Sequence, residues 1–157
     1  GYFLNVGDQQ SDILKLISTF TAQKHIKMIY AGGVSNIDKL VPRESRVYLS
    51  PEEWLGMYND AEAIFTNTFH GTVFALIYHK NFIVFLQKGK TAKQNERLYS
   101  LLQMIGLESR VYDETKEISI QLQEPIEWER VESIIAELRR NSIQFLKDAL
   151  ERKEREH

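Results

Sequence analysis

The segment from Asn81 to Leu86 is the feature of this sequence that most constrains its fold. After Asn81 come five consecutive apolar residues, Phe-Ile-Val-Phe-Leu, with no alternation between apolar and polar positions. A strand that is apolar on both faces is typical of a parallel sheet with helices covering each side. The run is far too short to cross a membrane as a helix. It therefore predicts an interior strand of an α/β domain.

The residues before this run alternate between strand-like and helix-like segments, which is the pattern of βαβ units. Five parallel strands are expected, at 2–6, 25–30, 46–49, 62–66 and 81–86. Helices are expected around 13–20, after Ser50, over 71–78, and over 95–105 with Gly106 as the stop. Ser50, Pro51 and Glu53 match a capping box with proline at the first helical position. Residues 113–125 lack clear periodicity, and a long amphipathic helix is expected at about 126–152.

Composition narrows the possible functions. The length of 157 residues suits a single domain. The 20 Lys+Arg and 22 Asp+Glu residues give a net charge of -2, which does not favour a nucleic-acid-binding protein. The absence of cysteine excludes disulfides, thiolate catalysis and thiolate metal sites, and is compatible with the cytoplasm. No signal-peptide or membrane-spanning pattern is visible, and the chain begins as though inside a structural unit.

Ligands of open parallel sheets bind beyond the carboxyl ends of the strands. Five segments qualify by position: Gly7-Asp8-Gln9, Ala31-Gly32-Gly33, Ser50, Thr66–Gly71, and the loop that begins at Gln87. The segment Thr66-Asn67-Thr68-Phe69-His70-Gly71 is the strongest candidate, because it is a polar strand-to-helix turn between apolar flanks. A helix N-terminus favours anions, so Thr68 and the N–H groups around Gly71 are expected to hold a phosphate or carboxylate.

His70 is the candidate acid or base of this turn. The helix N-terminus disfavours the imidazolium form, while a bound phosphate favours it, and this balance suits a proton donor or acceptor. A plainer interpretation is that Thr68 caps the helix and that His70 is an ordinary first-turn residue. Both interpretations are compatible with the sequence.

A second group of candidates follows the last predicted strand. Lys88, Lys90, Lys93 and Arg97 are expected on the same edge as His70, where they would clamp a phosphorylated ligand. The alternative is a solvated loop whose lysines contact nothing. Asn95 is either a ligand contact or the N-cap of the next helix. His25 is expected to be exposed and His79 to be structural. With no carboxylate to complete a set, no metal site is expected.

Several of these segments together resemble the polysaccharide pyruvyl transferase family. The resemblance covers most of residues 2–110 and is densest from Leu49 onward. It rests on Leu-Ser-Pro-Glu-Glu-Trp-Leu (49–55), Phe-Thr-Asn-Thr-Phe-His-Gly-Thr-Val-Phe (65–74), Asn-Phe-Ile-Val (81–84), Asn-Glu-Arg-Leu (95–98), Leu-Leu (101–102) and Gly-Leu-Glu-Ser-Arg (106–110). The order and spacing of these blocks carry the resemblance.

The resemblance implies a Rossmann-like domain that forms the C-terminal half of a two-domain, GT-B-like bacterial enzyme. It implies transfer of a pyruvyl group from phosphoenolpyruvate, without another cofactor, to a sugar or lipid-linked saccharide of an exopolysaccharide or cell-wall polymer. His70 matches the motif histidine and would act as acid or base. Thr68, Gly71, Asn67, Asn95, Lys88 and Arg97 are the expected substrate contacts. The expected location is cytoplasmic, including the inner face of the membrane, and the chain alone is expected to be inactive without an N-terminal domain.

This sequence departs from the family in the turn itself. Relatives often carry Asp-Ser where this chain has Asn67-Thr68, and some carry arginine where it has Phe69. Two alternatives therefore stay open: a GT-B glycosyltransferase-like domain that binds a nucleotide sugar, and a non-catalytic α/β binding module. A receiver module is disfavoured, because Ser50 rather than an aspartate follows the third predicted strand.

Overall fold

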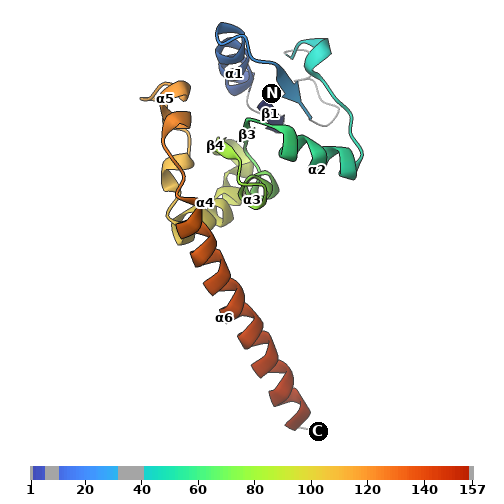
Figure 1. The fold of residues 1–157 in the computed structure, drawn as a ribbon, viewed down its shortest axis with the longest axis vertical. Helices are drawn as coiled ribbons and strands as arrows, with labels where there is room; N and C mark the ends of the chain where they lie inside the picture. Colours follow the sequence, from blue (N-terminus) through green and yellow to red (C-terminus); the bar gives the residue numbers. More distant parts are fainter. Residues whose placement is uncertain (1, 6–10, 32–40, 156–157) are drawn as a thin grey trace.

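The computed structural model describes residues 2–5, 11–31 and 41–155. Its four strands are β1 (Tyr2–Asn5), β2 (Met28–Tyr30), β3 (Ala63–Thr66) and β4 (Asn81–Val84). All pair in parallel, in the order β2-β1-β3-β4. The α-helices are α1 (Ser11–Gln23), α2 (Pro51–Asp60), α3 (Phe69–Ile77), α4 (Asn95–Ile105), α5 (Ile118–Gln123) and α6 (Trp128–Arg155) (Figure 1). The predicted α/β class with a parallel sheet and a long final helix is confirmed.

The two faces of the sheet are buried in two separate apolar clusters. On one face, Phe65 and Ile83 pack with residues of α1 and α5. On the other face, Ile64 and Phe82 pack with residues of α2, α3, α4 and the start of α6. These four strand residues have no exposed surface, which confirms that β4 is apolar because both of its faces are covered.

The strand order places a topological switch point between β1 and β3. From β1 the chain passes through α1 to β2, whereas from β3 it passes through α3 to β4, on the opposite side and over the opposite face. Such a reversal leaves a crevice at the carboxyl ends of the two central strands, where ligands of doubly wound sheets bind. The turn after β3 lies at this edge.

The third predicted strand, residues 46–49, is wrong. Arg46 forms only an isolated bridge to Tyr30, and Val47 donates one hydrogen bond to the Tyr30 carbonyl. The Arg46 guanidinium folds back onto the carbonyl of Val41, with Nε at 2.9 Å. Tyr48 is 70% exposed, and Val47 and Leu49 are only half-buried, so this segment lacks the burial of β3 and β4. The described sheet therefore has four strands rather than five.

The predicted start and end signals of two helices are confirmed, whereas the predicted number of strands is not. Ser50 and Glu53 form both hydrogen bonds of the capping box, and Gly106 ends α4 in the left-handed conformation. The short helix α5 was not expected, because residues 113–125 lack periodicity. The long helix starts at Trp128, close to the predicted position, and extends away from the body of the domain (Figure 1). Within the described ranges, no helix combines the length and apolarity that a membrane span requires.

Candidate functional site

The turn between β3 and α3 is held by its threonines. Thr68 is the N-cap of α3, and its Oγ1 accepts a hydrogen bond of 3.0 Å from the Gly71 N–H. The Thr66 and Thr68 hydroxyls lie 3.2 Å apart, and the Thr68 N–H donates to Thr66 Oγ1. These bonds confirm the capping interpretation of Thr68. They also show that the Gly71 N–H is engaged within the turn.

Gly71 is required here by packing. It is buried, and a Cβ atom at this position would lie 2.1 Å from Thr66 Oγ1 and 2.8 Å from Thr68 Oγ1. The first turn of α3 therefore lies directly on the end of β3, which only glycine allows. The sequence had suggested close approach to an anion, whereas the close approach observed is to the threonine side chains. An anion contact at Gly71 stays a prediction.

His70 is the second residue of α3 and its side chain is exposed. As a first-turn residue its N–H has no acceptor within the helix, and the same holds for Phe69. The imidazole therefore stands at the carboxyl edge of the sheet, beside the positive end of a helix and open to a ligand. The position expected from the sequence is observed, while its catalytic role is not tested by the geometry.

Arg97 of α4 lies over the same turn. Its guanidinium carbon is 5.3 Å from the centre of the Phe69 ring, within the range of a cation–π contact. The Phe69 ring in turn meets the His70 ring edge to face, with the ring centres 6.0 Å apart. Two candidates from separate helices, Arg97 and His70, thus both contact one aromatic ring.

Asn95 and Asn67 have structural contacts. The Asn95 side chain pairs with the backbone of Gln87, accepting from its N–H and donating to its carbonyl at 2.9 Å each. It is not the N-cap of α4, since Gln94 occupies that position. Asn67 is 3% exposed, and its carbonyl accepts a 3.0 Å hydrogen bond from Gln87 Nε2. Gln87 thus ties α4 to the turn after β3, and substrate contacts for either asparagine stay predictions.

The lysine loop forms a 3₁₀ helix, Gly89–Gln94, between β4 and α4. Lys88 and Lys93 are exposed, while the side chain of Lys90 lies outside the described part. Lys88 directly follows Gln87, which places it on the same edge as the His70 turn. The structure does not place Lys93 against the other candidates.

The remaining candidates are two glycine-containing segments and two histidines. Gly7-Asp8-Gln9 and Gly32-Gly33 lie outside the described residues. His25 is exposed, as expected. His79, at the other end of α3, stacks on Trp128 with ring centres 4.7 Å apart and lies 2.8 Å from a Glu132 oxygen, so its predicted structural role is confirmed. No group of three potential metal ligands occurs among the described histidine, aspartate and glutamate residues.

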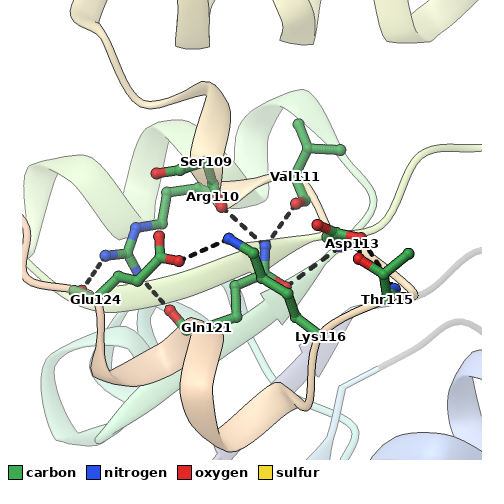
Figure 2. Close-up of polar contacts among 8 residues, drawn as sticks. All are labelled: Ser109, Arg110, Val111, Asp113, Thr115, Lys116, Gln121 and Glu124. Carbon is green, nitrogen blue, oxygen red and sulfur yellow. Dashed lines mark hydrogen bonds and ion pairs between the residues drawn. The ribbon is translucent and has the colours of Figure 1, made fainter.

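A buried polar cluster near the end of the domain was not anticipated. Arg110 is 1% exposed and donates to the Asn81 side chain and to the carbonyls of Gln121 and Glu124. Burial lowers the pKa of the Arg110 guanidinium, against the opposing effect of the Glu124 carboxylate. Gln121, drawn beside Arg110 in Figure 2, is also 1% exposed. The only feature of the sequence that could have indicated this cluster is the position of Arg110, directly before the apolar Val111.

Comparisons with known proteins give one match. The family model described as polysaccharide pyruvyl transferase matches residues 6–88, more than half of the chain. The matched range contains the turn after β3 with His70, and it ends at Lys88. Neither the curated proteins nor the solved structures contain a match to this chain.

Proposed function

We propose a reaction for this chain, which belongs to the polysaccharide pyruvyl transferase family. The reaction is transfer of a pyruvyl group from phosphoenolpyruvate to two hydroxyls of a saccharide, giving a cyclic ketal and inorganic phosphate. The observation that carries the proposal is the position of His70. This histidine lies inside the matched range, exposed, at the carboxyl edge beside the switch point of the sheet.

The chemistry requires a proton donor and cations. Protonation of the methylene carbon of phosphoenolpyruvate makes its central carbon electrophilic. A saccharide hydroxyl then adds to that carbon, phosphate leaves with the C–O bond electrons, and a second hydroxyl closes the ketal. The two hydroxyls release two protons. One restores the proton that the acid gave to the methylene carbon, and the other goes to phosphate. A group that alternates between acid and base is therefore needed beside an anion site.

His70 fits the acid and base role because one nitrogen of a neutral imidazole donates a proton while the other accepts one. Its exposed ring allows substrate to reach it, and the adjacent N–H groups of the first turn of α3 favour an anion at the same place. The Thr66–Thr68 hydrogen bonds and the close packing of Gly71 fix the turn that carries it. This rigidity supports a defined position for the ring.

Arg97 is proposed as the cation that pairs with the phosphate or carboxylate of phosphoenolpyruvate. Some relatives carry arginine at the position of Phe69, and here a guanidinium from α4 lies above that phenylalanine ring. A cation is thus present beside Phe69 despite the substitution. Lys88 is proposed to assist from the loop after β4.

The complete enzyme is proposed to have two domains of the GT-B type, with this chain as the C-terminal one. A cytoplasmic location, including the inner face of the membrane, follows from the proposed donor and a lipid-linked acceptor. Because one half of a cleft cannot align both substrates, the chain alone is expected to bind donor without turnover.

The test is a titration followed by NMR of the histidine ring signals, assigned with single substitutions. Phosphoenolpyruvate is expected to shift the signals of His70 saturably, with little change at His25 and His79. A nucleotide sugar is expected to leave all three unchanged. Arg97→Met should weaken the phosphoenolpyruvate response, because it removes the cation and keeps an unbranched side chain. A response to the nucleotide sugar alone would favour the glycosyltransferase-like alternative and overturn the proposal.

A further inference from the structure

A cleft of about 630 Å³ opens beside β4, and of the residues given a role above only Lys88 lines it. Its walls include Ile13 of α1, Leu86 after β4 and Tyr112 after the 3₁₀ turn Glu108–Arg110. Val111 extends the sheet by one parallel bridge to Val84, and the Tyr112 N–H donates to the Val84 carbonyl. The chain therefore leaves the sheet at Tyr112 on the carboxyl edge, where substrates bind.

One wall of the cleft is fixed by a buried amide. Gln121 of α5 donates from Nε2 to the carbonyls of Ser109 and Val111, at 2.8 and 2.6 Å. Its Oε1 accepts from the Asp113 N–H at 3.3 Å. Figure 2 shows this side chain lying between α5 and the segment that it holds. The wall is thus positioned before any ligand arrives, which lowers the ordering cost of binding.

Tyr112 supplies an aromatic surface at this wall. Its ring packs at 4.8 Å from the ring of Phe85, which is itself 1% exposed and so unavailable to a ligand. Tyr112 is half-buried and lines the cleft, so the remaining part of the ring is accessible. An aromatic face with a hydroxyl at its end suits a ligand that is apolar on one side and polar at its edge. A pyranose ring, with C–H faces and equatorial hydroxyls, has this character.

The charges around the cleft select against acidic ligands. Glu108, Asp113 and Glu114 line it, against Lys88 and Lys116. Lys116 is paired with Glu124 at 2.9 Å, which offsets its charge. Hydrogen bonds from the Thr115 side chain and backbone hold the pKa of Asp113 below its usual value, so this carboxylate is charged at neutral pH. Carboxylates accept hydrogen bonds from sugar hydroxyls and repel a uronate.

The cleft adjoins the His70 turn through Gln87. Leu86 and Lys88, on either side of this residue, line the cleft, while Gln87 Nε2 donates to the carbonyl of Asn67 in the turn. Gln87 therefore connects the segment that lines the cleft to the turn that carries His70.

We propose that this cleft binds the saccharide acceptor, stacked on Tyr112, and that it selects an uncharged sugar residue over a uronic acid. The proposal rests on the proposed function, because it assigns the acceptor of that reaction. It adds the place where the acceptor binds and the class of sugar that is accepted.

The experiment is saturation-transfer NMR on the full-length protein with two probes, methyl β-glucopyranoside and methyl β-glucuronide. Saturation of the glucoside ring protons is expected, with a response about fivefold weaker for the glucuronide because of like-charge repulsion. Tyr112→Leu keeps an apolar contact with Phe85 and removes the aromatic face, so it should abolish the glucoside response. Glu114→Gln should raise the glucuronide response toward that of the glucoside.

The control is Glu127→Gln, an equally exposed carboxylate that does not line the cleft, and it should leave the ratio of the two probes unchanged. Equal responses of both probes in the wild-type protein, or a glucoside response that survives Tyr112→Leu, would overturn the assignment. The same samples are titrated with phosphoenolpyruvate. A shift of His70 without a glycoside response refutes only the acceptor cleft, whereas a glycoside response without a shift of His70 refutes the proposed reaction.

Discussion

Replacement of Gly71 by alanine tests the packing that fixes the His70 turn. The added Cβ would lie 2.1 Å from Thr66 Oγ1, 2.8 Å from Thr68 Oγ1 and 2.9 Å from Thr66 Cβ. Distances this short cannot be absorbed by a small rotation, because the third atom belongs to a β-branched side chain of a buried strand. The turn has to shift, and the Gly71–Thr68 capping bond is expected to break.

The magnitude follows from three contributions. Overpacking of this kind costs about 1–3 kcal/mol. Loss of a threonine N-cap costs about 0.5–2 kcal/mol. The higher helix propensity of alanine returns about 1 kcal/mol. The Gly71→Ala protein is therefore expected to be less stable by about 2 kcal/mol, which lowers the melting temperature by about 4–8 °C for a chain of this length.

The assay is thermal unfolding together with urea denaturation, and Gly56→Ala is the matched control. Gly56 is exposed within α2, and a Cβ there meets nothing within 4 Å. The same substitution should therefore stabilise the protein by about 1 kcal/mol. Opposite signs for the two variants are the expected result. An unchanged or raised melting temperature for Gly71→Ala would refute the close packing of α3 on β3.

The same substitution in a Thr66→Ala protein tests whether the Thr66 side chain causes the loss of stability. Thr66→Ala removes the oxygen nearest to the added methyl group, so the penalty of Gly71→Ala should be smaller in a Thr66→Ala protein. The rescue should be partial, because the Cβ of residue 66 remains in contact. An equal penalty in both backgrounds would mean that the threonine hydroxyl is not the obstacle.

Three further predictions concern stability. Ser50→Ala removes the capping box and should cost about 1 kcal/mol in urea denaturation, while Ser50→Asp restores most of it. Arg110→Met leaves the Asn81 side-chain oxygen and two backbone carbonyls without their donor, and should cost about 2–4 kcal/mol by the same assay. Burial, and then the carboxylates of Glu114 and Asp113, raise the pKa of Tyr112 above its ordinary 10.0. The neutral Tyr112 side chain therefore contributes fully to the stability of the folded state below pH 10.0, and this contribution declines above it. The loss of stability between pH 9 and pH 11 should be smaller in Tyr112→Phe, and an identical loss would contradict this.

Features of this chain set by local sequence were predictable. The capping box at Ser50 involves residues three apart, and the stop at Gly106 depends on that residue's own conformation. The burial of β4 follows from its unbroken apolar run. The exposed position of His70 follows from its place in the first turn after a strand. In each case a short stretch of sequence carries the signal, even where the packing partners are distant, as for β4.

Features set by distant partners were not predictable. Residues 46–49 have strand-like composition, but β2 offers them an edge of only three residues and Arg46 turns to Val41 instead. Asn95 is a residue type that often caps helices, yet its side-chain amide hydrogen-bonds to the backbone of Gln87. Gln121 lies in a segment without periodicity, and its three hydrogen bonds go to residues 8 to 12 positions away. Nothing in the local sequence specifies these partners.

The most direct measurement is pyruvyl transfer by the full-length protein with His70→Gln, compared with His25→Asn. Both histidines are exposed, and asparagine tolerates the positive φ of residue 25. The His70→Gln protein should lose transfer at an unchanged melting temperature, while the His25→Asn protein keeps full activity. Transfer that persists in His70→Gln would contradict the role of this histidine at the edge of the sheet.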